Sequence, residues 1–111
     1  MSTQVAAGPT TLDYVKTIGL TNNGDNGRGY ANPCSLAVSS DGRIFVLNRC
    51  DPPRADAIRV GICNLDEDYL HEFGSFGQGD GQFEFATAIA MDRRERVYVA
   101  DEYHHDISVF E

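Results

Sequence analysis

The residues best suited to chemistry gather at positions 101–106, where two adjacent histidines are flanked by carboxylates. Imidazole and carboxylate groups are ligands for Zn²⁺ and similar ions. Neighbouring residues of a strand point to opposite faces, however, so a strand here would separate His104 from His105. We therefore predict no metal and no cofactor, and keep a site at His104 and His105 as the alternative.

Other motifs for catalysis do not emerge from the sequence. Its serines lack the G-x-S-x-G context of a nucleophile, and no cysteine has an evident histidine partner. The glycine-rich stretch 74–81 matches no phosphate-binding motif. Three cysteines without a C-x-x-C pair fit neither a disulfide framework nor a zinc site, although Cys34 and Cys50 are expected close enough that their pairing stays open. We predict no catalytic residues.

Composition narrows the function further. The chain has 111 residues, with 9 Lys and Arg against 17 Asp and Glu and a formal net charge of -8. This charge disfavours nucleic acid and anionic membranes, both of which attract basic surfaces. No apolar run approaches the roughly 20 residues of a membrane span, and the first ten residues lack the features of a signal peptide. We expect one small, soluble, cytoplasmic domain.

The elements that position these residues follow from an internal repeat. Residues 31–48 align without gaps on residues 84–101, an offset of 53 positions. Further along, Ile58 and Val60 are matched with Ile107 and Val109 if the first copy has a longer loop. Residues 14–19 are similar to residues 69–74.

Each copy has short runs of β-branched and aromatic residues between turn residues, which predicts strands. The strands are expected at 14–19, 35–39, 43–48, 57–62, 69–74, 88–91, 96–101 and 107–110. Residues 40–43 contain Asp-Gly and predict a hairpin turn with a positive φ. The matching residues 93–96 lack glycine and are expected to use a different turn.

The second copy resembles an NHL repeat, the blade of a class of β-propellers. The resemblance rests on residues 77–83, 88–92, 97–101 and 104–110, of which His105 and Ile107 match the family's Asn-His-x-Ile signature and His104 replaces its asparagine. The first copy is weaker and keeps Ile58 and the family's proline, Pro33. The resemblance implies four-stranded blades, six to a ring, and structural roles for the signature residues Asp101, His105 and Ile107.

The strands then divide the chain into all-β units: two four-stranded antiparallel propeller blades, one third of a six-bladed propeller. The divisions are a flexible N-terminal tail (1–13), an outer strand that completes a neighbouring blade (14–19), a first NHL-like blade (20–74) and a second NHL-like blade without its outermost strand (75–111).

The outer strand at the front and the gap at the back predict that three chains close a head-to-tail ring. The alternative is a fragment of a longer propeller. The predicted contacts between chains are Tyr14, Val15, Lys16, Thr17, Ile18, Ile107, Val109 and Phe110.

Loops on one face of such a ring are the predicted binding surface, because loops on a rigid frame often carry function. The residues are Arg28, Asp51, Arg54, Asp56, Asp80, Glu102, Tyr103 and His104. We expect a binding scaffold for a protein or a small ligand. The alternative is a propeller-type lyase or hydrolase with a histidine-bound metal at the channel mouth.

Overall fold

The computed structural model describes residues 3–7, 10–19, 29–49 and 57–111, with residues 3–7 and 10 as backbone only. The described residues form strands and turns, as predicted, and include no α-helix. None of them forms a helix with the length and apolar character that crossing a membrane requires.

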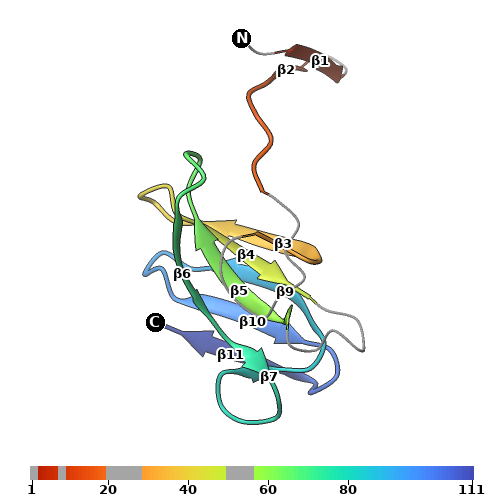
Figure 1. Ribbon diagram of the computed structural model, residues 1–111, viewed down its shortest axis with the longest axis vertical. Helices are drawn as coiled ribbons and strands as arrows, with labels where there is room; N and C mark the ends of the chain where they lie inside the picture. The colour runs from red at the N-terminus through yellow and green to blue at the C-terminus, as the bar shows by residue number, and fades with distance from the viewer. Residues whose placement is uncertain (1–2, 8–9, 20–28, 50–56) are drawn as a thin grey trace.

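Two antiparallel sheets make up the body of the molecule (Figure 1). The first sheet runs in sequence order through β3 (Pro33–Val38), β4 (Ile44–Asn48), β5 (Arg59–Cys63) and β6 (Tyr69–Phe73). The second sheet contains β9 (Ala86–Met91), β10 (Val97–Asp101) and β11 (Asp106–Phe110). The prediction of one four-stranded and one three-stranded antiparallel sheet is confirmed.

The core lies between the sheets, whose first strands β3 and β9 lie against each other. Phe45, Leu47, Val60 and Ile62 come from the first sheet, and Ile89, Val97 and Val99 from the second. At the edge of the core, the ring of Phe110 in β11 lies 4.8 Å from that of Phe73 and 5.9 Å from that of Phe83. Burial of these side chains is the main contribution to stability.

The two hairpins that join the first and second strands use the same turn, contrary to expectation. Gly42 has a φ of 87°, and Glu95, at the equivalent position, has a φ of 61°. The amide of Ser39 donates to the Arg43 carbonyl at 2.9 Å, and the amide of Asp92 repeats this bond to Arg96 at 3.1 Å. A non-glycine residue in this region is unfavourable by itself, so the bonds around it must offset the cost.

The bonds that offset this cost come from the first sheet. The carboxylate of Glu95 accepts hydrogen bonds from the amide of Ser40 at 2.7 Å and from its hydroxyl at 2.6 Å. A contact with the first sheet therefore fixes the hairpin of the second sheet. This contact allows Glu95 to adopt the positive φ that Gly42 has in the first sheet.

The third strands pair with the second strands in a register that corrects the alignment. Asn48 lies opposite Arg59, and Asp101 lies opposite Asp106. Val60 and Ile62 are thus the counterparts of Ile107 and Val109, an offset of 47 rather than 49 positions. The loop of the first copy is longer than the match at Ile58 suggested.

The N-terminal region differs from the prediction in two ways. Residues 1–13 were expected to be a flexible tail, but β1 (Thr3–Ala7) and β2 (Thr10–Tyr14) form a hairpin apart from the body (Figure 1). Residues 14–19 were expected to be one strand, but Tyr14 ends β2 and residues 15–19 run outside any sheet. An outer strand needs an edge to pair with, and this segment pairs with none of the described strands of its own chain. Short β7 (Ser75–Phe76) and β8 (Gln82–Phe83), which pair in parallel, were not predicted.

We predict that Gly42→Ala lowers the free energy of unfolding by about 1 kcal/mol, because an L side chain is disfavoured at positive φ. A Cβ at this position would meet no atom within 4 Å, so the cost arises from the backbone alone. Urea unfolding measures the change. The control is Arg94→Ala in the other hairpin, which should stay within about 0.5 kcal/mol. Equal losses in both variants would contradict the assigned turn.

Candidate interaction surfaces

The predicted loop face is described only in part. Arg28, Asp51, Arg54 and Asp56 lie outside the described residues. Asp80, Glu102 and Tyr103 are exposed, Tyr103 at 65%.

The described loop-face residues line two separate hollows. Asp80 and His104 belong to one of about 410 Å³, whereas Glu102 and Tyr103 line a shallower one with Phe85 and His105. The structure therefore does not bring the described loop residues into one site.

Buried anchors at the ends of the second strands hold these loops. Asn48 accepts hydrogen bonds from the amides of residues 31 and 32 at 2.9 and 2.8 Å. Asp101 accepts hydrogen bonds from the amides of residues 84 and 85 at 2.8 and 3.3 Å. The donors and acceptors are related by the same offset of 53 positions that relates the sequences. Asp101 is 3% exposed and Asn48 1%. Asp101 thus has a structural role, and Asn48 makes the equivalent contact in the first copy.

Asp101 also closes the turn that follows it. Its carboxylate accepts the amides of Tyr103 and His104, both at 3.0 Å. Burial opposes ionisation, but the amide hydrogen bonds from Glu84, His104 and Phe85 outweigh it and hold the pKa of this carboxyl below its ordinary value. The charge of Asp101 therefore stabilises the fold.

His104, predicted for the loop face, is mostly buried, with 14% of its side chain exposed. Its Nε2 lies 3.3 Å from Glu84 Oε1, and its Nδ1 lies 3.5 Å from Asp101 Oδ2. These contacts hold the imidazole against the body of the second sheet. His104 therefore takes the structural position that the family resemblance implied for His105.

His105 itself does not have the predicted role. It is exposed in the turn before β11, with a φ of 57°. The family resemblance implied a structural role for His105, but the turn formed by Asp101 to Asp106 directs this residue outward. The signature residue Ile107 is also exposed, at 65%.

The described residues give the alternative metal site no support. Among them, no three His, Cys, Asp or Glu side chains are grouped so as to hold a metal ion. His104 and His105 line different hollows. Cys34 and Cys63 are free thiols, and the prediction about Cys50 falls outside the described residues.

The outer face of the second sheet, turned away from the core, is apolar. Its cross-strand rows are Ala88, Ala100 and Ile107, and Ala90, Tyr98 and Val109. Ala88, Ala90, Ile107 and Val109 are exposed. Their counterparts in the first sheet include Val60 and Ile62, which are buried in the core. The residues of this outer face therefore correspond, through the repeat, to residues of the first sheet that form the core.

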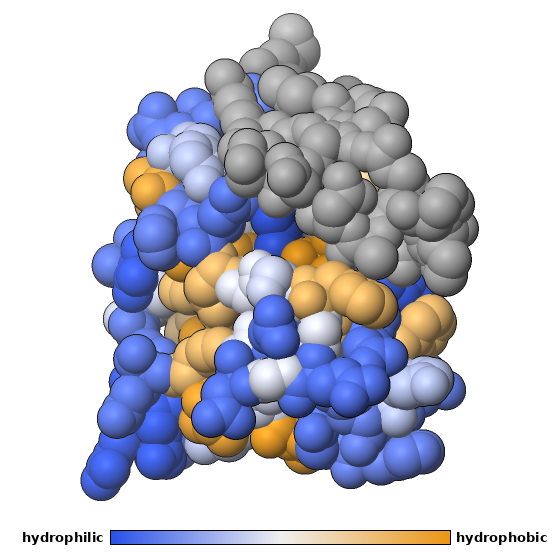
Figure 2. Space-filling model, turned by 60° about the horizontal axis from the view of Figure 1, so that its bottom comes forward, coloured by the Kyte–Doolittle hydropathy of each residue, from blue (hydrophilic) through white to orange (hydrophobic). Residues whose placement is uncertain are grey.

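The outer face of the first sheet shows the reverse relation. Its rows are Leu36, Val46 and Gly61, and Val38, Ile44 and Cys63. Leu36 is 59% exposed and Val38 57%. At an offset of 53 positions they correspond to Ile89 and Met91, which belong to the core or pack against it. Apolar side chains also reach the surface between polar ones in the view of Figure 2.

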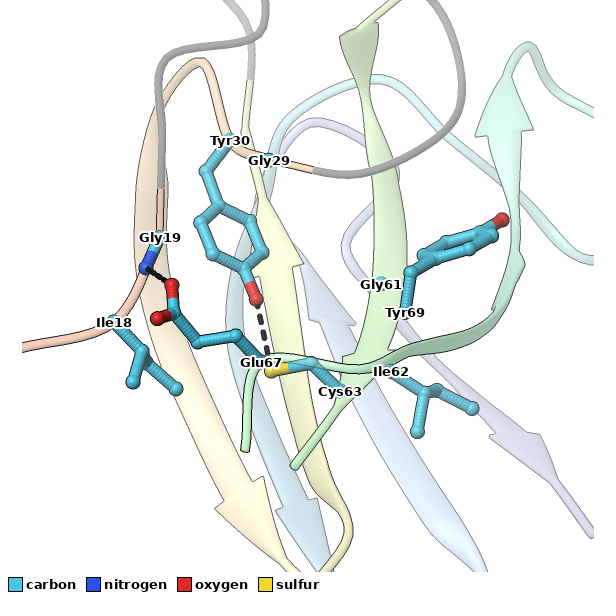
Figure 3. Close-up of a pocket in the computed structure, with 9 residues that line it drawn as sticks. All are labelled: Ile18, Gly19, Gly29, Tyr30, Gly61, Ile62, Cys63, Glu67 and Tyr69. Carbon is cyan, nitrogen blue, oxygen red and sulfur yellow. Dashed lines mark hydrogen bonds between the residues drawn. The ribbon is translucent and has the colours of Figure 1, made fainter. Parts of the chain in front are cut away.

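Residues 18–19 approach the outer face of the first sheet (Figure 3). The Tyr30 hydroxyl lies 3.0 Å from Cys63 Sγ, and the amide of Gly19 donates to Glu67 at 3.2 Å. Burial, with the hydrogen bond to Cys63, raises the pKa of the Tyr30 hydroxyl. The cavity beside these residues is about 20 Å³, too small for a ligand larger than water.

Gly19 and Tyr30 repeat a contact from the other sheet. A Cβ on Gly74, after β6, would lie 2.5 Å from Phe83, and a Cβ on Gly19 would lie 3.3 Å from Tyr30. Both glycines have a positive φ, 87° and 121°. The residue that ends the segment, Gly19, thus lies against Tyr30, before the first sheet, as Gly74 at the end of β6 lies against Phe83, before the second sheet.

Comparison of the sequence with models of protein families gives no match, and comparison with curated proteins gives none.

Sequence reasoning did not assign residues to the two outer faces and missed the contact of Gly19 with Tyr30. The offset of 53 positions could have identified the faces if it had been applied to alternate residues of each strand, because alternation assigns residues to faces.

We predict that Asp101→Ala lowers the free energy of unfolding by about 1–3 kcal/mol, because it leaves buried amides without an acceptor. Asp101→Asn, which copies Asn48, should cost less. Because the folded pKa is lowered, the charge of Asp101 contributes stability above its unfolded pKa of about 3.9, and this contribution is lost as the pH falls through the folded value. In urea unfolding, the difference between wild type and Asp101→Asn should therefore shrink from pH 7 to pH 3; a constant difference would contradict this role.

The two histidines should respond in opposite ways to substitution. His104→Ala should lower the free energy of unfolding by about 1–2 kcal/mol through lost buried contacts. His105→Gly should leave it within about 0.5 kcal/mol, because relief at positive φ offsets the greater freedom of the unfolded chain. Thermal and urea unfolding of both variants would show this, and a larger loss for His105→Gly would reverse the assignment.

Proposed function

We propose that the protein is a binding scaffold of the NHL-type β-propeller class, in which each sheet is one blade and three copies associate head to tail in a six-bladed ring. The observation that carries this proposal is the relation between the outer faces. The residues of each outer face correspond, through the repeat, to residues that form the core in the other sheet of the same chain.

The outer faces can pack as the core does. Val60 and Ile62 of the first sheet pack on the second, and their counterparts Ile107 and Val109 are 65% and 53% exposed. An exposed apolar surface of this kind favours association, because burying it removes apolar area from water. The face it fits is the outer face of the first sheet in another copy, since that face corresponds to the one packed inside the chain.

Such a contact is head to tail, and it closes into a ring when the rotation between copies allows. Propellers typically have four to eight blades. The NHL resemblance favours six, which three copies of a two-sheet chain supply. The proposed partner is therefore the chain itself, in a homotrimer.

A ring would repeat the loops three times on one face. Asp80, Glu102 and Tyr103 are exposed there, the last two on the turn that Asp101 holds in place. A fixed frame with exposed loops suits binding of a protein or small ligand. The acidic composition favours a partner without strong negative charge.

We predict a light-scattering mass of about three times 12.2 kDa for the chain. Ala90→Glu places a charge on the outer face of the second sheet, where Ala90 is exposed within one chain, and should give a folded monomer. Tyr103→Glu adds the same charge in the exposed turn after β10 and should remain trimeric. Circular dichroism checks that both variants keep their strands. A monodisperse wild-type monomer, or a trimer unaffected by Ala90→Glu, would refute the proposed ring.

A further inference from the structure

The outer edge of β11 is open in the described chain. β11 pairs with β10, and no described strand lies on its other side. In the first sheet, β6 occupies the equivalent edge of β5. An open edge presents unpaired amide and carbonyl groups that a further strand can pair with.

Hollows beside this edge leave room for the side chains of such a strand. One, of about 410 Å³, has an apolar wall of Phe45, Phe73, Val97 and Phe110. A second hollow of about the same volume is lined by Asp106, Ser108 and Phe110 of β11 and by the loop 78–82. Both hollows include Phe110, and together their linings contain Asp106, Ser108, Val109 and Phe110 of β11.

The segment 14–19 has the features of the occupant. It is similar in sequence to residues 69–74, which contain β6. Residues 14–17 are exposed, with Val15 at 73% and Tyr14 at 47%. Gly19, which ends the segment, contacts Tyr30 as Gly74 contacts Phe83.

The β11 edge that this segment fits belongs to another copy. Within its own chain the segment is bound at the turn after β5, where Lys16 donates to the Leu65 carbonyl and Gly19 donates to Glu67. β11 lies in the other sheet, away from this segment (Figure 1).

We propose that residues 14–19 of one copy form the outer strand of the second sheet of its neighbour by pairing antiparallel with β11. The register follows from the first sheet, where Phe73, Glu72 and His71 lie opposite Val60, Gly61 and Ile62. Transferred to the second sheet, it places Ile18 opposite Ile107, Thr17 opposite Ser108 and Lys16 opposite Val109. This inference rests on the proposed ring.

The chemistry of the three pairs suits this register. Ile18 and Ile107 form a β-branched apolar pair, and Thr17 and Ser108 form a hydroxyl pair that can hydrogen-bond across strands. The aliphatic stem of Lys16 can cover Val109 while its ammonium group keeps its hydrogen bond to the Leu65 carbonyl of its own chain. A slip by one residue would place Ile18 opposite Ser108 and turn every side chain to the other face.

Cysteine cross-linking of the 111-residue chain tests the register. The double variant Ile18→Cys with Ile107→Cys brings the thiols opposite each other, and Ile18→Cys with Ser108→Cys is the control displaced by one residue. After mild oxidation, the first variant should give covalent dimers and trimers on a non-reducing gel, which a reductant reverses. The displaced pair and the single-cysteine variants should give only the background from Cys34, Cys50 and Cys63.

The outcomes separate this inference from the proposed ring. Each variant's native mass is measured before oxidation. A trimer in which the displaced pair links as well as the first pair, or in which neither links, overturns the strand exchange and leaves the ring. A link within one chain, seen as a faster-moving monomer, also overturns it. A native monomer refutes both proposals. Removal of residues 1–19 should abolish the trimer, and a trimer that survives this deletion overturns the strand exchange.

Discussion

Face-to-face packing of the two sheets is the interaction on which the rest of the structure depends. A β-sheet has two faces, and a sheet packed on one side only leaves the other in water. Phe45, Leu47 and Val60 of the first sheet pack against the second sheet. The second sheet contributes Ile89 and Val97 to the same core. Apolar residues continue on both outer faces, so the chain carries the same packing surface at two further places. The fold of one chain and its proposed assembly thus have one physical origin.

Polar contacts fix the geometry in which this packing occurs. Asn48 and Asp101 fasten the chain entering each sheet to the end of its second strand. Between the sheets, the hydroxyl of Ser35 accepts a hydrogen bond from the amide of Ile89 at 3.2 Å, and the carboxylate of Glu95 accepts hydrogen bonds from Ser40. Apolar packing has no preferred direction, whereas hydrogen bonds do, so these few residues define how the sheets meet.

The sequence was informative wherever the two copies agree. Strand order, the all-β class and the hairpin at Gly42 follow from local patterns, because alternation and turn residues act over a few positions. The errors arise where tertiary contacts decide. Glu95 adopts a positive φ because Ser40 of the other sheet stabilises it, and His105 turns outward because Asp101 closes a tight turn. The register of the third strand was misjudged because the loop before it differs in length between the copies.

The repeat also distinguishes the junction within a chain from the one proposed between copies. At an offset of 53 positions, Ser40 corresponds to Arg93, and Glu95 corresponds to Gly42. A junction between copies would therefore place Arg93 where Ser40 stands and Gly42 where Glu95 stands, without the carboxylate that joins the sheets of one chain. Ser35 likewise corresponds to Ala88, which has no hydroxyl. The proposed contact between copies would thus depend on apolar packing and strand pairing, while polar bonds hold the sheets of each chain together, so the two-sheet chain is the unit that would assemble.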